Sequence, residues 1–116
     1  MADKAERRRA EILQGMLDML ILKTLAHEPL HGYAVAQRIR LVSGDRIRIP
    51  QGSLYPALHR LENRGLLRGD WTATATGRDA KYYRLTPKGR RHLQEEVTGW
   101  QELSAAIALI LQTGRA

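Results

Sequence analysis

The sequence contains no cysteine and no phenylalanine, and its 116 residues hold no long hydrophobic run. Without cysteine the chain can form neither a disulfide nor a thiolate metal site, and it has no cysteine nucleophile. The longest apolar stretch, Met16–Leu22, is interrupted by Asp18 and is far too short to cross a bilayer. The charged segment Met1–Arg9 is not followed by an apolar run typical of a signal peptide. We therefore expect a cytoplasmic protein that does not enter a membrane.

The residues that usually carry catalysis or bind metals are scattered along the chain. The four histidines include no pair at metal-ligand spacing on one helix face. The ten glycines stand singly at the ends of predicted elements, so there is no glycine-rich phosphate loop. Acidic residues fall mainly among opposite charges on predicted helix surfaces, and no carboxylate pair is typical of acid–base catalysis. The sequence predicts no catalytic residue, no metal ligand and no cofactor, and it disfavours an enzyme.

The chain is strongly basic and carries enough apolar residues for one modest core. Its formal net charge is +7, its isoelectric point is near 10.4, and 43% of its residues are hydrophobic. This length and composition predict a folded chain with a single core rather than global disorder. The charge favours a polyanionic partner, although charge alone leaves nucleic acid, a membrane surface and an acidic protein open.

Apolar spacings of three and four predict that most of the chain is helical. The first predicted helix is Ala5–Ala26, and the second follows Gly32 and ends at Gly44. The last helix has Thr86 as N-cap and Pro87 in its first position, and it ends near Gln112.

Between these helices the sequence predicts a small β-hairpin. Leu66–Trp71 and Ala80–Leu85 have the character of strands, and the polar loop Thr72–Asp79 joins them. An earlier link, Asp45–Pro50, alternates isoleucine with arginine as a short strand does. The predicted order is three helices, a hairpin and a final helix.

The third helix lies within Pro50–Gly65, and Gly65 ends it. With Ser53 as N-cap, Pro56 occupies the third helical position, where its missing N–H would have had no intrahelical partner. A start at Pro50 would place Pro56 in the helix interior, so we predict the later start. Four residues at spacings of three and four form the apolar face: Leu54, Ala57, Leu58 and Leu61.

The opposite face of the third helix consists of small and polar residues that can enter a major groove and meet base edges. They are Gly52, Ser53, Tyr55, Pro56, His59, Arg60 and Asn63. An ordinary surface helix can show the same mixture, so this face alone leaves both interpretations open. The hairpin tip adds Arg78 and Lys81, which suit phosphates or a minor groove, or else a solvated turn. A helix–turn–helix followed at once by a basic hairpin favours DNA for both.

The last helix carries an apolar stripe at spacings of four and three. Its apolar members are Leu93, Val97, Trp100, Ile107 and Leu111, with Ser104 as the polar interruption. Three short helices and a hairpin can cover only part of this stripe, so we expect a partner subunit to cover the rest. The alternative is a terminal helix folded back on its own core.

The strings GSLYPALHRLENRGLL and GRDAKYYRLTPKGRRHL resemble the PadR family of bacterial winged-helix regulators, and LKTLAHEPLHGYAVAQRI resembles that family's first two helices. The resemblance spans about Leu13 to Leu111. It implies a homodimer that binds operator DNA, usually as a repressor. It also implies that the dimer forms through a single C-terminal helix, which pairs with the partner. It implies that residues 1–86 form a winged helix-turn-helix domain and 87–116 a dimerisation helix. The implied DNA-binding residues are Gln51, Gly52, Ser53, Tyr55, Pro56, His59, Arg60, Arg78 and Lys81.

Two further roles follow from the resemblance. Gly32 and Tyr33 would set the start of the second helix, and core packing is preferred over a phosphate contact for Tyr33. Trp100 is similar in position to a tryptophan that stacks planar drugs at the dimer centre in multidrug-sensing members. The implied ligand-binding residues are Ile12, Gly15, Asp18, Met19, Trp100 and Ser104. Ser104 stands where the drug-binding members have an acid, which weakens the case for cationic drugs.

Several alternatives stay open. Asp18 could serve a cation-binding pore, lie at the surface, or hydrogen bond across a dimer interface, and Trp100 could be interface core rather than a ligand platform. The favoured function is a sequence-specific DNA-binding regulator that binds double-stranded operator DNA as a homodimer, with a small aromatic molecule as possible effector. A winged-helix module for protein–protein assembly and an RNA-binding protein are the rivals. The low aromatic content of 5% disfavours RNA.

Overall fold

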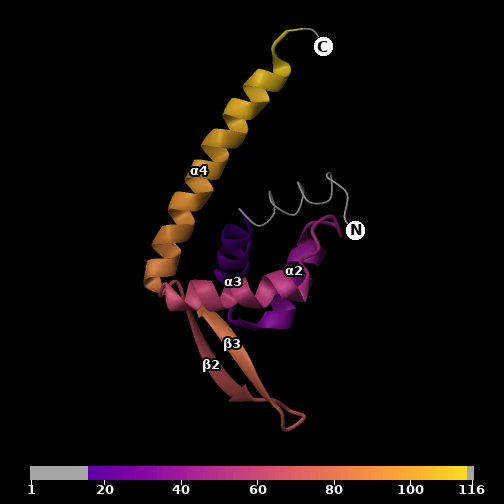
Figure 1. Ribbon diagram of the computed structural model, residues 1–116, viewed down its shortest axis with the longest axis vertical. Coiled ribbons are helices and arrows are strands. Elements are labelled where there is room, and N and C mark those ends of the chain that lie inside the picture. Colours follow the sequence, from indigo (N-terminus) through magenta and orange to yellow (C-terminus); the bar gives the residue numbers. More distant parts are fainter. Residues whose placement is uncertain (1–15, 115–116) are drawn as a thin grey trace.

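The computed structural model describes residues 16–114, and Figure 1 shows their arrangement. A first helix, described over residues 16–25, leads through a turn into a helical body from which a hairpin extends on one side and a long helix on the other. The elements that follow the first helix are β1 (Leu30–His31), α2 (Gly32–Val42), α3 (Gln51–Asn63), β2 (Leu67–Ala73), β3 (Asp79–Leu85) and α4 (Pro87–Gln112).

The core lies where the first helix, α2 and α3 meet the base of the hairpin. The predicted apolar face of α3 is fully buried there, since Leu54, Ala57, Leu58 and Leu61 are each 0% exposed. Spacings of three and four place these four side chains over successive turns of one helix face. The other buried apolar side chains come from every remaining element except β1: Leu17, Ile21, Leu22, Leu25, Val35, Ile39, Leu66, Leu67, Tyr83 and Leu93.

Glycine ends both inner helices as the sequence predicts. Gly44 follows α2 with a φ of 64°, and Gly65 follows α3 with a φ of 75°, a conformation that L side chains rarely adopt. After α3, the Gly65 N–H donates to the Glu62 carbonyl at 2.9 Å and the Leu66 N–H donates to the Leu61 carbonyl at 3.0 Å. This pair of bonds is the Schellman arrangement, which satisfies the last carbonyls of a helix and turns the chain into β2.

The predicted start of α3 at Ser53 is wrong. The helix begins at Gln51 with Pro50 as its N-cap, and the Pro50 carbonyl accepts hydrogen bonds from the N–H groups of Ser53 and Leu54, both at 3.0 Å. Pro56 therefore lies inside the helix, where it leaves the Gly52 carbonyl without its usual donor. Gly52 is exposed in the first turn, so water can satisfy that carbonyl, and this limits the cost of an internal proline.

Over residues 16–114 the sheet has three strands, one more than the predicted hairpin. Residues Leu30–His31 form the short strand β1, which pairs antiparallel with β3 and gives the order β1-β3-β2. The hairpin strands are longer than predicted, and the loop between them is reduced to residues 74–78. The link 45–50 is not a strand, although Ile47 and Ile49 alternate with exposed arginines and pack against the core.

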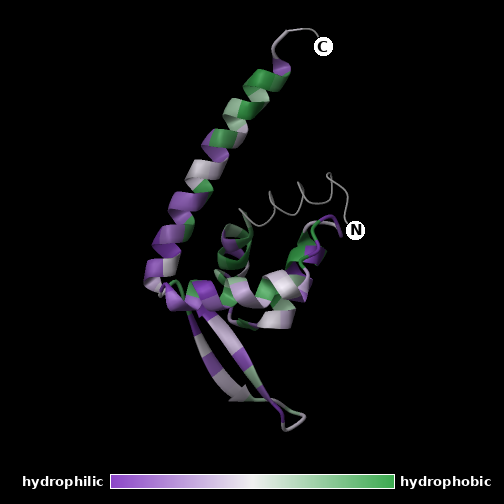
Figure 2. Ribbon diagram, viewed as in Figure 1, coloured by the Kyte–Doolittle hydropathy of each residue, from purple (hydrophilic) through white to green (hydrophobic). Residues whose placement is uncertain are grey.

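The long helix α4 begins as predicted and then leaves the body. Thr86 caps it by accepting the Gly89 N–H at 2.9 Å, and Pro87 occupies the first turn. Gly89 and Leu93 are buried, whereas from residue 98 onward every described residue but Ala108 is exposed. Figure 2 shows that this exposed C-terminal half is also the apolar half. In the part of the chain that the structure describes, no helix is long and apolar enough to cross a membrane.

Candidate nucleic-acid interface

The solvent-facing side of α3 carries a row of exposed residues spaced four, three and four apart. We call Gly52, Pro56, His59 and Asn63 the outer ridge; all four are exposed, and they lie opposite the buried leucines. Gln51, Ser53, Tyr55 and Arg60, which the sequence also assigned to DNA binding, are exposed on the first turn and the flanks of the ridge. A helix with small residues in its first turn and an imidazole and an amide further along can approach base edges in a major groove.

Tyr55 connects α3 to the start of α2. Its ring covers Gly32 so closely that a Cβ on Gly32 would lie 2.8 Å from Cε1, while 39% of the tyrosine remains exposed. A side chain at Gly32 would displace the Tyr55 ring, and α2 begins at this glycine, as the resemblance implied. Tyr55 thus has both a packed face and a solvent-accessible part.

The first turn of α2 adds one surface that the sequence analysis assigned differently. Tyr33 is 51% exposed, so the preference for core packing at this residue is wrong. His31 caps the same turn, because its Nδ1 accepts the Ala34 N–H at 3.2 Å, and its ring meets the Tyr82 ring edge-on with centroids 5.7 Å apart. These contacts hold the N-terminus of α2 against β3 and leave the Tyr33 side chain accessible to a partner.

The hairpin, residues 67–85, forms a wing beside α3. Arg78 is exposed in its tip loop, as expected, but Lys81 is not at the tip. The Lys81 Nζ donates to Glu62 Oε1 at 2.7 Å, and it lies 5.3 Å from the centre of the Tyr83 ring. The Glu62 hydrogen bond raises the pKa of Lys81, and burial raises the pKa of Tyr83. Lys81 therefore joins the wing to α3 instead of extending toward solvent.

Glu62 also holds the neighbouring strand. Its Oε2 accepts the Gly69 N–H at 3.2 Å, so one carboxylate bridges β2 and β3. A Cβ on Gly69 would meet Lys81 Cε and Glu62 Oε2, so a side chain at that position would displace the ends of these two side chains. We call Glu62, Gly69 and Lys81 the wing latch. No local pattern predicts this cluster, because Gly69 and Lys81 belong to β2 and β3, whereas Glu62 belongs to α3.

The wing carries further groups that the sequence analysis did not assign. Trp71 is 69% exposed and pairs across the strands with Lys81, so it lies on the same sheet face as the latch. On the other face, Asp70 is 3.4 Å from Arg68 Nε and 3.6 Å from Arg84 Nε. The strict alternation of strand residues could have separated these two faces had the extent of β2 been known.

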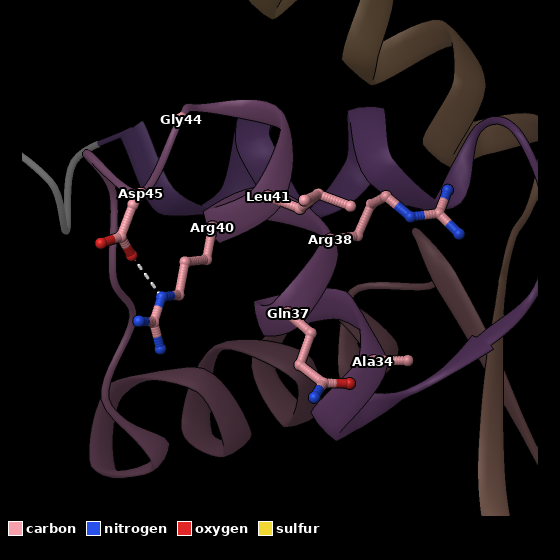
Figure 3. A pocket seen from close by; sticks show the side chains of 7 residues that line it. All are labelled: Ala34, Gln37, Arg38, Arg40, Leu41, Gly44 and Asp45. Carbon is pink, nitrogen blue, oxygen red and sulfur yellow. Dashed lines mark hydrogen bonds and ion pairs between the residues drawn. The ribbon is translucent and has the colours of Figure 1, made fainter.

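An aspartate paired with two arginines precedes α3. Asp45 accepts hydrogen bonds from Arg48, at 2.7 Å, and from Arg40, and these bonds lower the pKa of Asp45. Figure 3 shows Asp45 at one end of an open hollow on α2 that has a volume of about 680 Å³. Its lining residues are Ala34, Gln37, Arg38, Arg40, Leu41, Gly44 and Asp45. None of them belongs to the predicted effector site.

The residues of that predicted effector site are only partly described. Ile12 and Gly15 lie outside the described residues, and Met19 is partly buried against the core. Trp100 and Ser104 are both exposed on α4. In the view of Figure 1 the first helix and α4 rise from the side of α3 opposite the hairpin. Asp18 is bound within its own chain, because its Oδ1 accepts a hydrogen bond from Arg60 Nη2 at 2.5 Å.

The sequence profile described as the transcriptional regulator PadR-like family matches residues 21–95. The chain belongs to the PadR-like family. It is 34% identical over 97 residues to the transcriptional regulator Rv3488 of Mycobacterium tuberculosis, covering 84% of this chain and 87% of that protein. As a member of a family of transcriptional regulators it is not an enzyme, which agrees with the sequence analysis.

Solved structures of similar proteins confirm the fold class. A PadR family transcriptional regulator from Eggerthella lenta is 34% identical with a TM-score of 0.79, and the match covers 95% of this chain and 94% of that one. A transcriptional regulator from Clostridium thermocellum is 25% identical with a TM-score of 0.81, covering 88% and 99%. The winged helix-turn-helix and the single C-terminal helix of a short PadR-like protein are therefore confirmed, and family membership implies DNA binding.

Proposed function

We propose that this PadR-like regulator is a homodimeric repressor that recognises double-stranded operator DNA with α3 and the wing. The observation that carries the proposal is the outer ridge, a row of exposed small and polar residues on a helix whose other face is the core. In the proposed complex two copies of α3 enter successive major grooves about 34–36 Å apart, and the wings contact flanking backbone. Bound at a promoter, such a dimer would block transcription.

The proposed DNA contacts are of two kinds: α3 contacts the bases, and the wing and α2 contact the backbone or the minor groove. The ridge residues His59 and Asn63, with Ser53 and the Tyr55 hydroxyl, can exchange hydrogen bonds with base edges, and Gly52 and Pro56 allow close approach. Arg78 at the wing tip is the proposed phosphate or minor-groove contact. The exposed Tyr33, in the first turn of α2, adds a hydroxyl for the backbone. Lys81 acts through the wing latch in this scheme and not as a direct contact.

The proposed dimer is formed by α4. The radius of gyration is 16.4 Å, against about 13 Å for a compact chain of this length, because α4 stands away from the body. Its exposed apolar side chains need cover, and a second copy supplies a matching surface. Leu93 is already buried and Val97 partly buried in their own subunit, so the interface is proposed to centre on Trp100, Ile107 and Leu111.

An aromatic effector is proposed to bind beside Trp100, where two α4 helices would meet. The indole is 40% exposed and can offer a stacking face. Addition of planar aromatic compounds should quench Trp100 fluorescence, measured with Trp71→Phe so that one tryptophan remains. The same quenching after Trp100→Phe in the wild-type background would show that the signal comes from Trp71, and an unchanged Trp100 signal would remove the effector site.

The DNA proposal is tested by a mobility shift on the region upstream of the chain's own gene, with a random duplex as competitor. Tyr55→Phe keeps the ring over Gly32, so the fold should persist while operator preference falls about tenfold, as for one lost base contact. Tyr55→Ala removes that packing as well and should abolish preference. Wild-type protein that does not distinguish the operator from the random duplex would instead favour a protein–protein module.

A further inference from the structure

Asp18 of the first helix lies against the C-terminal half of α3. Its Oδ1 accepts a hydrogen bond from Arg60 Nη2 at 2.5 Å, and its Oδ2 lies 3.9 Å from Arg64 Nη1. The aspartate side chain is 24% exposed, while those of Arg60 and Arg64 are 43% and 47% exposed. A mostly covered carboxylate is thus shared by two guanidinium groups that remain open to solvent.

This arrangement neutralises the basic charge of α3. Arg60 is the only lysine or arginine within Gln51–Asn63, and Arg64 is the residue that caps its end. Arg60 adjoins His59 of the outer ridge, so its guanidinium could reach a nearby phosphate by a change of side-chain rotamer. Asp18 instead holds it on the flank that faces the first helix. An otherwise basic protein therefore presents a recognition helix whose cations are already paired.

We propose that Asp18 competes with DNA phosphate for Arg60 and Arg64 and so limits the affinity of α3 for DNA. The inference rests on the proposed DNA-binding function. An ion pair between partly exposed side chains contributes little to stability, whereas an arginine on phosphate makes charge-assisted hydrogen bonds and releases condensed counterions. The carboxylate therefore opposes binding more than it supports the fold. Because Asp18 lies on the first helix, displacement of that helix from α3 would change DNA affinity.

Asp18→Asn tests the competition. Affinity for duplex DNA should rise about three- to tenfold at low salt, and the plot of log K against log salt should steepen by about one for each additional phosphate that an arginine neutralises. The melting temperature should change little. Glu28→Gln is the matched control, because it makes the same chemical change and frees Arg38 from a 3.0 Å pair between residues that do not belong to α3. It should leave the salt slope at the wild-type value.

A second mutation assigns the increase in affinity to the arginines. Arg60→Ala combined with Asp18→Asn should make the salt slope about one unit shallower than in Asp18→Asn alone and leave only the increase that Arg64 supplies, whereas the same substitution in the wild type should have a smaller effect. Loss of affinity in Asp18→Asn, or an equal increase in Glu28→Gln, would overturn the proposal.

A heparin column provides a readout that does not depend on operator recognition. Asp18→Asn should elute at higher salt than the wild type and Glu28→Gln, because heparin is a polyanion that needs no sequence reading. Co-elution of Asp18→Asn with the wild type would contradict the competition even if operator binding were intact. Failure to distinguish the operator from random duplex, with the heparin shift present, would contradict only the proposed function.

Discussion

Glu62 of α3 and Lys81 of β3 form a 2.7 Å ion pair, and the same carboxylate accepts the Gly69 N–H of β2 at 3.2 Å. The two side chains are only 27% and 21% exposed, so the pair is shielded from solvent more than the other lysine and arginine pairs at the surface of the described body. The wing latch therefore sets the angle between the wing and the helix that we propose reads DNA.

Removal of the latch should weaken DNA binding even though it adds net positive charge. Glu62→Ala deletes both hydrogen bonds and is expected to lower the free energy of unfolding by about 1–2 kcal/mol. DNA affinity should fall about tenfold, because the wing loses its position, whereas electrostatics alone predicts tighter binding. Glu62→Gln keeps an acceptor for one bond and should lie between Glu62→Ala and the wild type.

Amide hydrogen exchange at Gly69 reports the latch directly. Protection should be lost in Glu62→Ala and partly kept in Glu62→Gln. Tighter DNA binding by Glu62→Ala would show that the carboxylate acts only through its charge.

The latch also predicts how stability depends on alkaline pH. The Glu62 hydrogen bond raises the pKa of Lys81 above its ordinary value of 10.5, and burial raises the pKa of Tyr83 above 10.0. A raised folded-state pKa means that the contribution is complete below the unfolded-state pKa and is lost as pH rises through the folded-state value. The free energy of unfolding should therefore fall as the pH rises above about 10.

Urea unfolding measured between about pH 8 and pH 11 tests this expectation. Lys81→Met and Tyr83→Phe should each flatten the alkaline decline, and Lys23→Met, which removes an exposed lysine of the first helix, should not. An unchanged slope in both Lys81→Met and Tyr83→Phe would rule out these two groups as its cause.

The sequence predicted the parts of the fold that local chemistry determines. The leucine face of α3 follows from spacing alone, and Gly44 and Gly65 follow from the left-handed conformation that ends a helix. The start of α3 was missed because the penalty for an internal Pro56 is reduced where the unpaired Gly52 carbonyl is exposed. Strand β1 is only two residues long and is defined by its pairing with β3, which no local pattern indicates.

The site was less predictable because, as for β1, its contacts join residues that are far apart in the chain. Arg60 and Lys81 are basic residues in positions suited to DNA, yet their partners are 42 and 19 residues away in the chain. A one-dimensional pattern gives the charge of a side chain but not what neutralises it. Tyr33 shows the converse, since an aromatic residue in an apolar segment proves to be exposed.

Two glycines of α4 should respond in opposite directions to alanine. A Cβ on Gly89 would collide with the carbonyl oxygen of Leu66, a backbone atom that cannot move aside cheaply, whereas a Cβ on Gly99 meets nothing within 4 Å. Gly89→Ala should cost about 1–3 kcal/mol of unfolding free energy, as overpacking does. Gly99→Ala should add about 0.5–1 kcal/mol through higher helix propensity. Thermal unfolding at one protein concentration measures both, and equal effects would mean that α4 does not dock at Leu66.

The proposed dimer predicts that one charge on the apolar stripe of α4 separates the subunits. Ile107 is 42% exposed in the single chain, so Ile107→Glu should leave the subunit folded, as circular dichroism would report. Burial of an unpaired carboxylate between two helices is costly, so light scattering after size exclusion should show a monomer near 13.1 kDa instead of a dimer.

Thr98→Glu is the matched control for this experiment, because Thr98 is exposed on the opposite side of the same helix and the added charge is identical. It should leave the dimer intact. Operator affinity should fall at least a hundredfold in Ile107→Glu, because each monomer then binds its half-site without help from a second subunit. Linking two binding modules raises their joint affinity about 10²–10⁴-fold, since the second module binds at a high effective concentration. A monomeric wild type would refute this interface, and a dimeric Ile107→Glu would place it elsewhere.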